Sequence, residues 1–199
     1  MSVKVNLKRI AALQSSFKLL IMILVLLTSP FLVILYTNIS GVLNTKAIAR
    51  KAACEAGISY DEARFIVAHL GGGTTISGHI NGRMIDLIND TEGCMTPERS
   101  GGLPNHDLVK LCFSGRFTEE EIIRKMEGAG GFFAYLGTKD LREVERRIKE
   151  GEKLPGDIMK TYLYQLTKVI GSMAAVLKFQ IDALVIAGSI AKSNLVMAH

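Results

Sequence analysis

The pattern of apolar and polar positions divides the chain into two dissimilar regions. The stretch Leu19–Tyr36 is almost wholly apolar, with only three interruptions. From residue 43 onward, short apolar runs alternate with turn-forming residues, as in a packed domain. We therefore expect a separate N-terminal segment, residues 1–42, and a folded lobe, residues 43–199.

A β-hairpin is the clearest element that the pattern predicts. The apolar run Phe65–Leu70 leads into three consecutive glycines, and the run Thr74–Ile80 follows them. Asn81-Gly82 then separates this run from Arg83–Ile88. Asn-Gly supplies the positive φ angles that a tight type I′ turn requires, so we expect the last two runs to pair as antiparallel strands.

Helices are predicted on both sides of this hairpin. Asn44 or Thr45 is expected to cap a helix that ends at Gly57, and a capping box at Thr118 opens another. Further helices are predicted from Lys139 to Gly151 and, with a broad apolar stripe including Tyr162, Leu166, Met173 and Val176, from Asp157 to Lys178. A strand, Asp182–Ile186, then runs into another glycine turn. The expected fold class is α/β.

The apolar N-terminal segment has three interpretations. No charged residue occurs from Leu19 to Thr45, and about 20 apolar residues suffice for a spanning helix. By the positive-inside rule, the basic flank before it would keep the amino terminus in the cytoplasm. A secretory signal is the second interpretation, although no clear cleavage site follows Leu27. The third is that the segment does not belong natively to the domain.

The basic character of the chain comes from this segment. The formal charge is +5, but the first 43 residues hold four basic residues and no acidic ones, which leaves 20 basic and 19 acidic residues in the remainder. Such a balance lacks the field that gathers phosphate backbones, so nucleic-acid binding is disfavoured. Three cysteines without Cys-x-x-Cys spacing indicate free thiols.

Glycines at the ends of strands are the candidate ligand-binding residues. Gly71, Gly72 and Gly73 leave a buried strand and precede Thr74-Thr75. Without Cβ atoms, their amides can approach an anion closely, although glycine-rich hairpins are also common as plain turns. A second glycine turn at Gly188, again after an apolar strand, favours a site for the phosphates and adenosine of a nucleotide.

Arg99 is the candidate cation. It lies in a loop rich in proline and glycine, where a guanidinium can offer a bidentate fork to a carboxylate or a phosphoryl group. The alternative is a surface arginine paired with Glu98 or a neighbour. His69 is expected to be a satisfied core histidine, and His79 and His106 to be surface residues; their spacing predicts no metal site.

Several motifs in one order resemble the butyrate kinases of the acetate kinase family, across about residues 43–193. They are Ile66–Gly73, Asn81–Asp86, Pro97–Pro104, Asp107–Gly115 and Ala134–Thr138. The resemblance implies one lobe of a two-lobed kinase, each lobe a ribonuclease H-like mixed sheet with flanking helices, as in sugar kinases, actin and chaperone ATPases. It also implies site residues: Gly71, Gly72, Gly73 and Thr74 for phosphate, Gly188, Ser189 and Ile190 for adenosine, and catalytic Arg99.

The function implied by the resemblance is phosphoryl transfer from ATP, carried with Mg²⁺, to butyrate or a short branched carboxylate, giving an acyl phosphate. A cytoplasmic location and a possible homo-oligomer also follow from it, with a membrane contact only if residues 19–36 are an anchor. The alternative is a non-catalytic, membrane-tethered module that binds nucleotide or a partner protein.

Departures from the family pattern shape one more expectation. Gly41 stands where family members have a histidine, Ser189 replaces the second glycine of the adenosine turn, and the family's first lobe and final segment have no counterpart. We expect the chain alone to show little kinase activity, because one wall of a cleft neither excludes water nor supplies the other lobe's donors. A truncated or frame-shifted coding region near codon 41 is the simplest hypothesis.

Overall fold

The computed structural model describes residues 30–198, and side chains from residue 43 onward. The predicted apolar segment Leu19–Tyr36 therefore lies mostly outside the described residues. The chain divides between Ser40 and Gly41, and the second part is described here by itself. None of the helices within residues 30–198 combines the length and the apolar character needed to cross a membrane.

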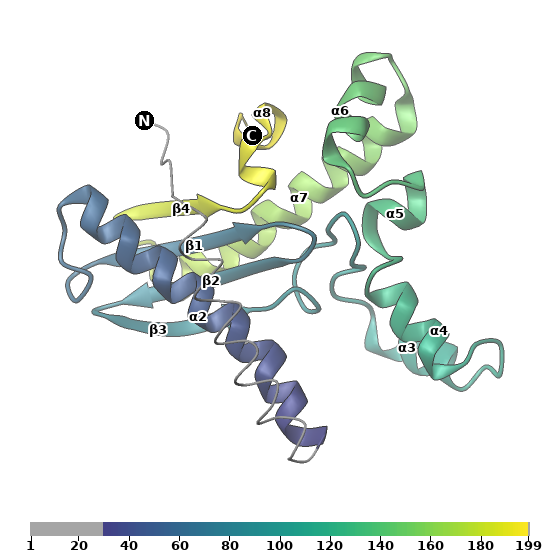
Figure 1. Cartoon of the computed structure of the whole chain (residues 1–199), viewed down its shortest axis with the longest axis horizontal. Helices are drawn as coiled ribbons and strands as arrows, with labels where there is room; N and C mark the ends of the chain where they lie inside the picture. Colours follow the sequence, from purple (N-terminus) through teal and green to yellow (C-terminus); the bar gives the residue numbers. More distant parts are fainter. Residues whose placement is uncertain (1–29, 199) are drawn as a thin grey trace, which may run out of the picture. The chain divides into compact units, whose positions relative to one another are not determined.

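A four-stranded mixed sheet forms the centre of this part, in the order β3-β2-β1-β4 (Figure 1). Strands β1 (Arg64–Leu70), β2 (Thr74–Ile80) and β3 (Arg83–Ile88) pair antiparallel in sequence order. Strand β4 (Ala183–Ala187) lies parallel to β1. Asn81 and Gly82 have φ angles of 50° and 74°, so the predicted hairpin is confirmed.

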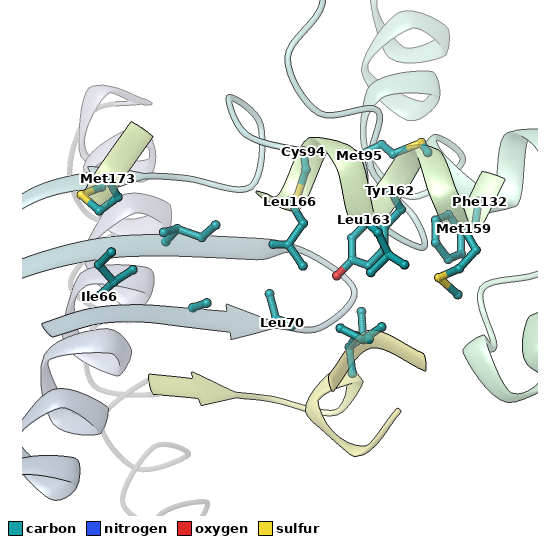
Figure 2. Packing of buried hydrophobic residues seen from close by; sticks show 14 of the residues in the cluster. Ile66, Leu70, Cys94, Met95, Phe132, Met159, Tyr162, Leu163, Leu166 and Met173 are labelled. Atoms are coloured by element: carbon teal, nitrogen blue, oxygen red, sulfur yellow. The ribbon is translucent and has the colours of Figure 1, made fainter. Parts of the chain in front are cut away.

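Helix α7 (Lys153–Val176) packs on one face of the sheet (Figure 2). Alternate residues of β1, including Ile66 and Leu70, share this core with Tyr162 and Met173. The helix lies so close to β2 that a Cβ on Gly78 would collide with Met173. This packing confirms the predicted core helix.

The opposite face of the sheet is covered by the last turns of helix α2 (Pro30–Ala56), from Ile48 to Ala53. The other alternate residues of β1, Phe65 and Val67, contact Ala49 and Ala53 there. A strand buried on both faces is expected to be apolar throughout, and β1 is apolar between its ends except at His69.

Four shorter helices connect β3 to α7: α3 (Asn105–Cys112), α4 (Glu119–Met126), α5 (Gly131–Leu136) and α6 (Leu141–Lys149). The predicted capping box of α4 is confirmed, because Thr118 and Glu121 bond reciprocally to each other's amides. Asp140 caps α6 by accepting from the amide of Arg142. After β4, the turn η1 (Ile190–Lys192) and helix α8 (Asn194–Met197) follow.

The predicted starts of two helices and the predicted burial of one residue were wrong. Helix α2 does not begin at Asn44 or Thr45 but runs through both, although its left-handed end at Gly57 is as predicted. Helix α7 begins at Lys153 rather than Asp157, since Pro155 in the first turn needs no N–H partner. Val176, expected in the buried stripe, is 47% exposed.

Candidate functional site

The two predicted glycine turns lie side by side because they follow neighbouring parallel strands. His69 of β1 pairs with Ala187 of β4, so both strands end at the same edge of the sheet. Gly188 has φ +99°, and a Cβ at this position would collide with the carbonyl of Leu70. Ligands of open α/β sheets bind at this type of edge, outside the carboxyl ends of parallel strands.

A cavity of about 420 Å³ opens at this edge. It joins four elements of structure: the β1–β2 turn, the loop after β3, the beginning of α6, and η1. Its lining residues are Gly71, Gly72, Pro97, Glu98, Lys139, Asp140, Leu141, Arg142, Glu145, Ser189, Ile190, Lys192 and Ser193. Of the predicted site residues, four line the cavity, whereas Gly73, Thr74, Arg99 and Gly188 lie behind or beside it.

The glycine turn is shaped by two acidic side chains as well as by its own backbone. A Cβ on Gly72 would collide with the carboxylate of Glu98, and one on Gly73 with that of Asp90. The amide of Gly71 donates to the Gly73 carbonyl at 2.9 Å. Within residues 43–198, the amides of Gly72 and Gly73 donate no hydrogen bond. Two donors of the turn are therefore available to a ligand.

The Arg99 guanidinium is held by two carboxylates of the chain itself. Nε lies 2.8 Å from Asp90 and Nη1 lies 2.9 Å from Glu127, with 24% of the Arg99 side chain exposed. The Nε contact is an ion pair without hydrogen-bond alignment. Glu98, the neighbour considered from the sequence, pairs instead with Lys139 at 3.0 Å. The fork is thus rigidly placed beside the glycine turn.

The three histidines within residues 43–198 behave differently from one another. His69 is half-buried and its Nδ1 has no partner among the described residues, so the prediction of a satisfied core histidine was wrong. His79 is fully buried rather than exposed: its ring nitrogens bond the hydroxyls of Tyr60 and Ser77 at 2.9 and 2.8 Å. Burial lowers the pKa of both, that of His79 to about 4. His106 is exposed, as predicted.

Unpartnered polar atoms gather around the glycine turn. In the described part of the chain, four buried side-chain polar atoms lack a hydrogen bond: His69 Nδ1, Thr74 Oγ1, Arg99 Nε and the Tyr162 hydroxyl. His69 and Thr74 flank the turn in sequence, and Figure 2 shows the Tyr162 hydroxyl directed from α7 toward the Leu70 end of β1. Burial also raises the pKa of Tyr162. Unsatisfied buried groups are rare, and their clustering marks a place for water or ligand.

Charges of both signs line the cavity. Lys139 is paired with Glu98, and Arg142 with Asp140 at 2.6 Å. Sequence reasoning missed these α6 residues, because nothing local shows that α6 begins beside the glycine turn. The Asp140 cap of α6 was the one signal available.

No group of three or more potential metal ligands exists among the described residues. Asp90 and Glu98, the carboxylates beside the turn, are both paired with cations. The buried Cys94 and the exposed Cys54 and Cys112 are all free, as predicted.

Comparison with known proteins places the chain among carboxylate kinases by sequence similarity. The model of the acetokinase family matches residues 43–198. Butyrate kinase 2 of Clostridium acetobutylicum is 45% identical over 163 residues, or 79% of this chain and 45% of the relative. Butyrate kinase 1 of the same organism is 44% identical over 156 residues, or 77% and 44%. The chain thus spans less than half the length of these relatives.

Solved structures show the same fold. Acetate kinase of Porphyromonas gingivalis has a TM-score of 0.68 and 29% identity, over 73% of this chain and 37% of that one. A propionate kinase of Francisella tularensis also has a TM-score of 0.68, at 23% identity, over 77% and 41%. These likenesses confirm the predicted kinase-type α/β lobe. With the match over residues 43–198, they show that the chain belongs to the acetokinase family.

Proposed function

We propose that residues 43–199 form the nucleotide-binding lobe of an ATP-dependent carboxylate kinase, and that residues 1–42 lie outside this lobe. The observation that carries the proposal is the cavity in which the turn after β1 meets the turn after β4. Family membership supports the reaction type. Phosphoryl transfer is proposed for the whole protein, and nucleotide binding for this chain.

The residues at the cavity fit a nucleotide. The amides of Gly72 and Gly73 would bind its phosphates, with Gly71 shaping the turn and Thr74 behind it. The unpartnered Nδ1 of His69 at the same strand end is a further polar group that a ligand or its water can satisfy. Gly188, Ser189 and Ile190, in the neighbouring turn after β4, would border adenosine. Mg²⁺, bound with ATP, would neutralise phosphate charge.

Arg99 would serve as the catalytic guanidinium. Its two ion pairs fix the plane of the fork before any substrate arrives, so little reorganisation would accompany the reaction. The carboxylate acceptor and the phosphoryl group in transfer both carry the negative charge that a guanidinium binds well.

Butyrate or a short branched carboxylate is the acceptor we favour, and the cytoplasm, where ATP is available, is the expected location. The curated relatives named butyrate kinase share up to 45% identity with the chain, against 29% for the solved acetate kinase. In the proposed reaction, a carboxylate oxygen attacks the γ-phosphorus of ATP and the bond between this phosphorus and the β–γ bridging oxygen breaks. The products are ADP and the acyl phosphate.

Calorimetric titration with ATP and Mg²⁺ tests the proposal. Saturable binding to the wild-type chain is expected, and Ser189→Tyr should abolish it by filling the cavity. Ser172→Tyr, on the exposed side of α7, is the matched control and should bind as the wild type does. Absence of saturable binding at millimolar ATP would contradict the proposal.

An assay for acyl phosphate tests the acceptor separately. Hydroxylamine traps acyl phosphates, and any hydroxamate formed by the chain should be greater with butyrate than with acetate or propionate. A higher rate with acetate would overturn the assignment of the acceptor but leave the nucleotide site intact.

A further inference from the structure

One basic side chain that lines the cavity forms no ion pair with an acidic residue of the described part of the chain. Three basic side chains line the cavity: Lys139, Arg142 and Lys192. The first two form ion pairs at 3.0 and 2.6 Å with carboxylates that also line it. Lys192 has no carboxylate within 4.0 Å in the part of the chain that the structure describes. Lys192 is therefore the lining cation whose ammonium forms no ion pair with a described carboxylate.

The backbone that carries Lys192 is anchored on both sides. Ile190 is 4% exposed and belongs to the main core. Ser193, 7% exposed, donates from its hydroxyl to Glu145 of α6 and accepts from the amide of Val196. Between these two fixed residues the Lys192 side chain is exposed and borders the cavity. The position of the charge is thus set by the fold, while the ammonium remains free to contact a ligand.

Glu145 is the third acid of the lining and makes the formal charges of the lining equal, but it forms no ion pair with Lys192 within 4.0 Å. Its carboxylate accepts the Ser193 hydroxyl and lies on α6, which forms another wall of the cavity. The segment around η1 contributes Ser189, Ile190, Lys192 and Ser193 to the lining, and Lys192 is the charged residue among them. An ammonium is a donor-only point charge, so it favours an anionic group over a neutral ring or a hydroxyl.

We propose that Lys192 contacts the phosphate chain of the bound nucleotide and raises affinity in proportion to the charge of that chain. This inference rests on the proposed function, because it assigns a specificity-determining residue to the same cavity. Lys192, which lines the same cavity, complements the uncharged amide donors of the β1–β2 turn. The order of affinity that it favours is ATP over ADP over AMP, with no contribution to adenosine.

Titration of four ligands into the wild type and three variants tests the inference. ATP, ADP, AMP and adenosine are compared, each at low and moderate salt, with Mg²⁺ present throughout. Lys192→Gln should lower the affinity for ATP by about tenfold and that for AMP by less, and should leave the affinity for adenosine unchanged. Lys192→Arg should retain most of the affinity for ATP. Lys160→Gln, whose side chain is 82% exposed on α7 and lies outside the cavity lining, is the charge-matched control.

The outcomes separate this inference from the function on which it rests. Equal ATP affinity for the wild type and Lys192→Gln would overturn the inference but keep the nucleotide site. An equal loss for adenosine and ATP would also overturn it, because it would indicate a steric role for Lys192 rather than a charge. Failure of the wild-type chain to bind ATP would overturn the proposed function itself.

Discussion

His69 and His79 occupy neighbouring strands of one sheet, and burial lowers the pKa of each, yet their surroundings differ completely. Both ring nitrogens of His79 have hydroxyl partners, Tyr60 and Ser77, in a closed network under α2. The Nδ1 of His69 has no partner within residues 43–198. One histidine completes the fold, and the other lies at the end of β1, beside the turn where a ligand is proposed.

The difference shows where the molecule tolerates an incomplete set of hydrogen bonds. A buried polar group without a partner costs about 1–3 kcal/mol, so its persistence needs a reason. On the α2 face the buried histidine and serine are satisfied, and that face serves packing. Near the glycine turn, in contrast, His69 Nδ1, Thr74 Oγ1 and the Tyr162 hydroxyl make no aligned hydrogen bond among the described residues, as expected beside a site completed by a ligand or ordered water.

The largest predicted effect is that of His79→Leu. This substitution leaves the hydroxyls of Tyr60 and Ser77 without their common partner in a fully packed region, so the free energy of unfolding should fall by about 3 kcal/mol. Urea denaturation measures this change. His106→Leu, at an exposed position, should change stability by less than about 0.5 kcal/mol. A similar small change at residue 79 would refute the closed network.

The same network should make the free energy of unfolding depend on pH. The pKa of His79 is about 4 in the fold against 6.5 as its ordinary value, first because of burial and then because of the charge of Lys46. The unfolded chain therefore binds the proton first, and stability is lost as pH falls from 6.5 toward 4, by about 3 kcal/mol in all. Unfolding curves across this range should be less steeply pH-dependent in His79→Leu. Identical pH dependence in both proteins would contradict the assignment.

Two tyrosines offer a smaller, matched comparison. Tyr60→Phe removes a hydroxyl that bonds His79 and should cost about 1–2 kcal/mol. Tyr162→Phe removes a hydroxyl that makes no aligned hydrogen bond in the described part of the chain, although it interacts with Thr74, so stability should change by less than about 1 kcal/mol. Thermal and urea unfolding of both variants checks the sign. A loss for Tyr162→Phe equal to that for Tyr60→Phe would show that water satisfies the Tyr162 hydroxyl in the free protein.

The smallest effect on stability is expected for His69→Leu. Because Nδ1 of His69 makes no internal hydrogen bond among the described residues, the unfolding free energy should change by less than about 1 kcal/mol. Affinity for ATP should nevertheless fall severalfold, the reverse of the pattern expected for His79→Leu. Parallel titration and denaturation of the two variants makes the test. A large stability loss without a change in ATP affinity would make His69 a structural residue.

Local signals allowed most of the sheet to be predicted. Asn81-Gly82 specifies the hairpin through φ angles alone, and Thr118 with Glu121 specifies the start of α4 through neighbouring amides. The glycine turns after β1 and β4 were also found, because each follows an apolar run that ends at a glycine.

The features that were missed depend on contacts between distant residues. His79 looked exposed because nothing near it in the chain shows that α2 covers that face of β2, and the expected cap at Asn44 or Thr45 concealed how far α2 extends. Arg99 pairs with Asp90 and Glu127 rather than with the adjacent Glu98. The α6 wall of the cavity was missed for the same reason, because only the folded chain brings it next to the glycine turn.

Amide and imidazole NMR spectra recorded during titration with ATP and Mg²⁺ test the central claim most directly. If nucleotide binds between the glycine turn and η1, the resonances of Gly71, Gly72, Ser189 and His69 should shift with one saturation curve, while those of Tyr60 and His79 stay in place. Shifts confined to the α2 face, or an unchanged spectrum at saturating ATP, would contradict it.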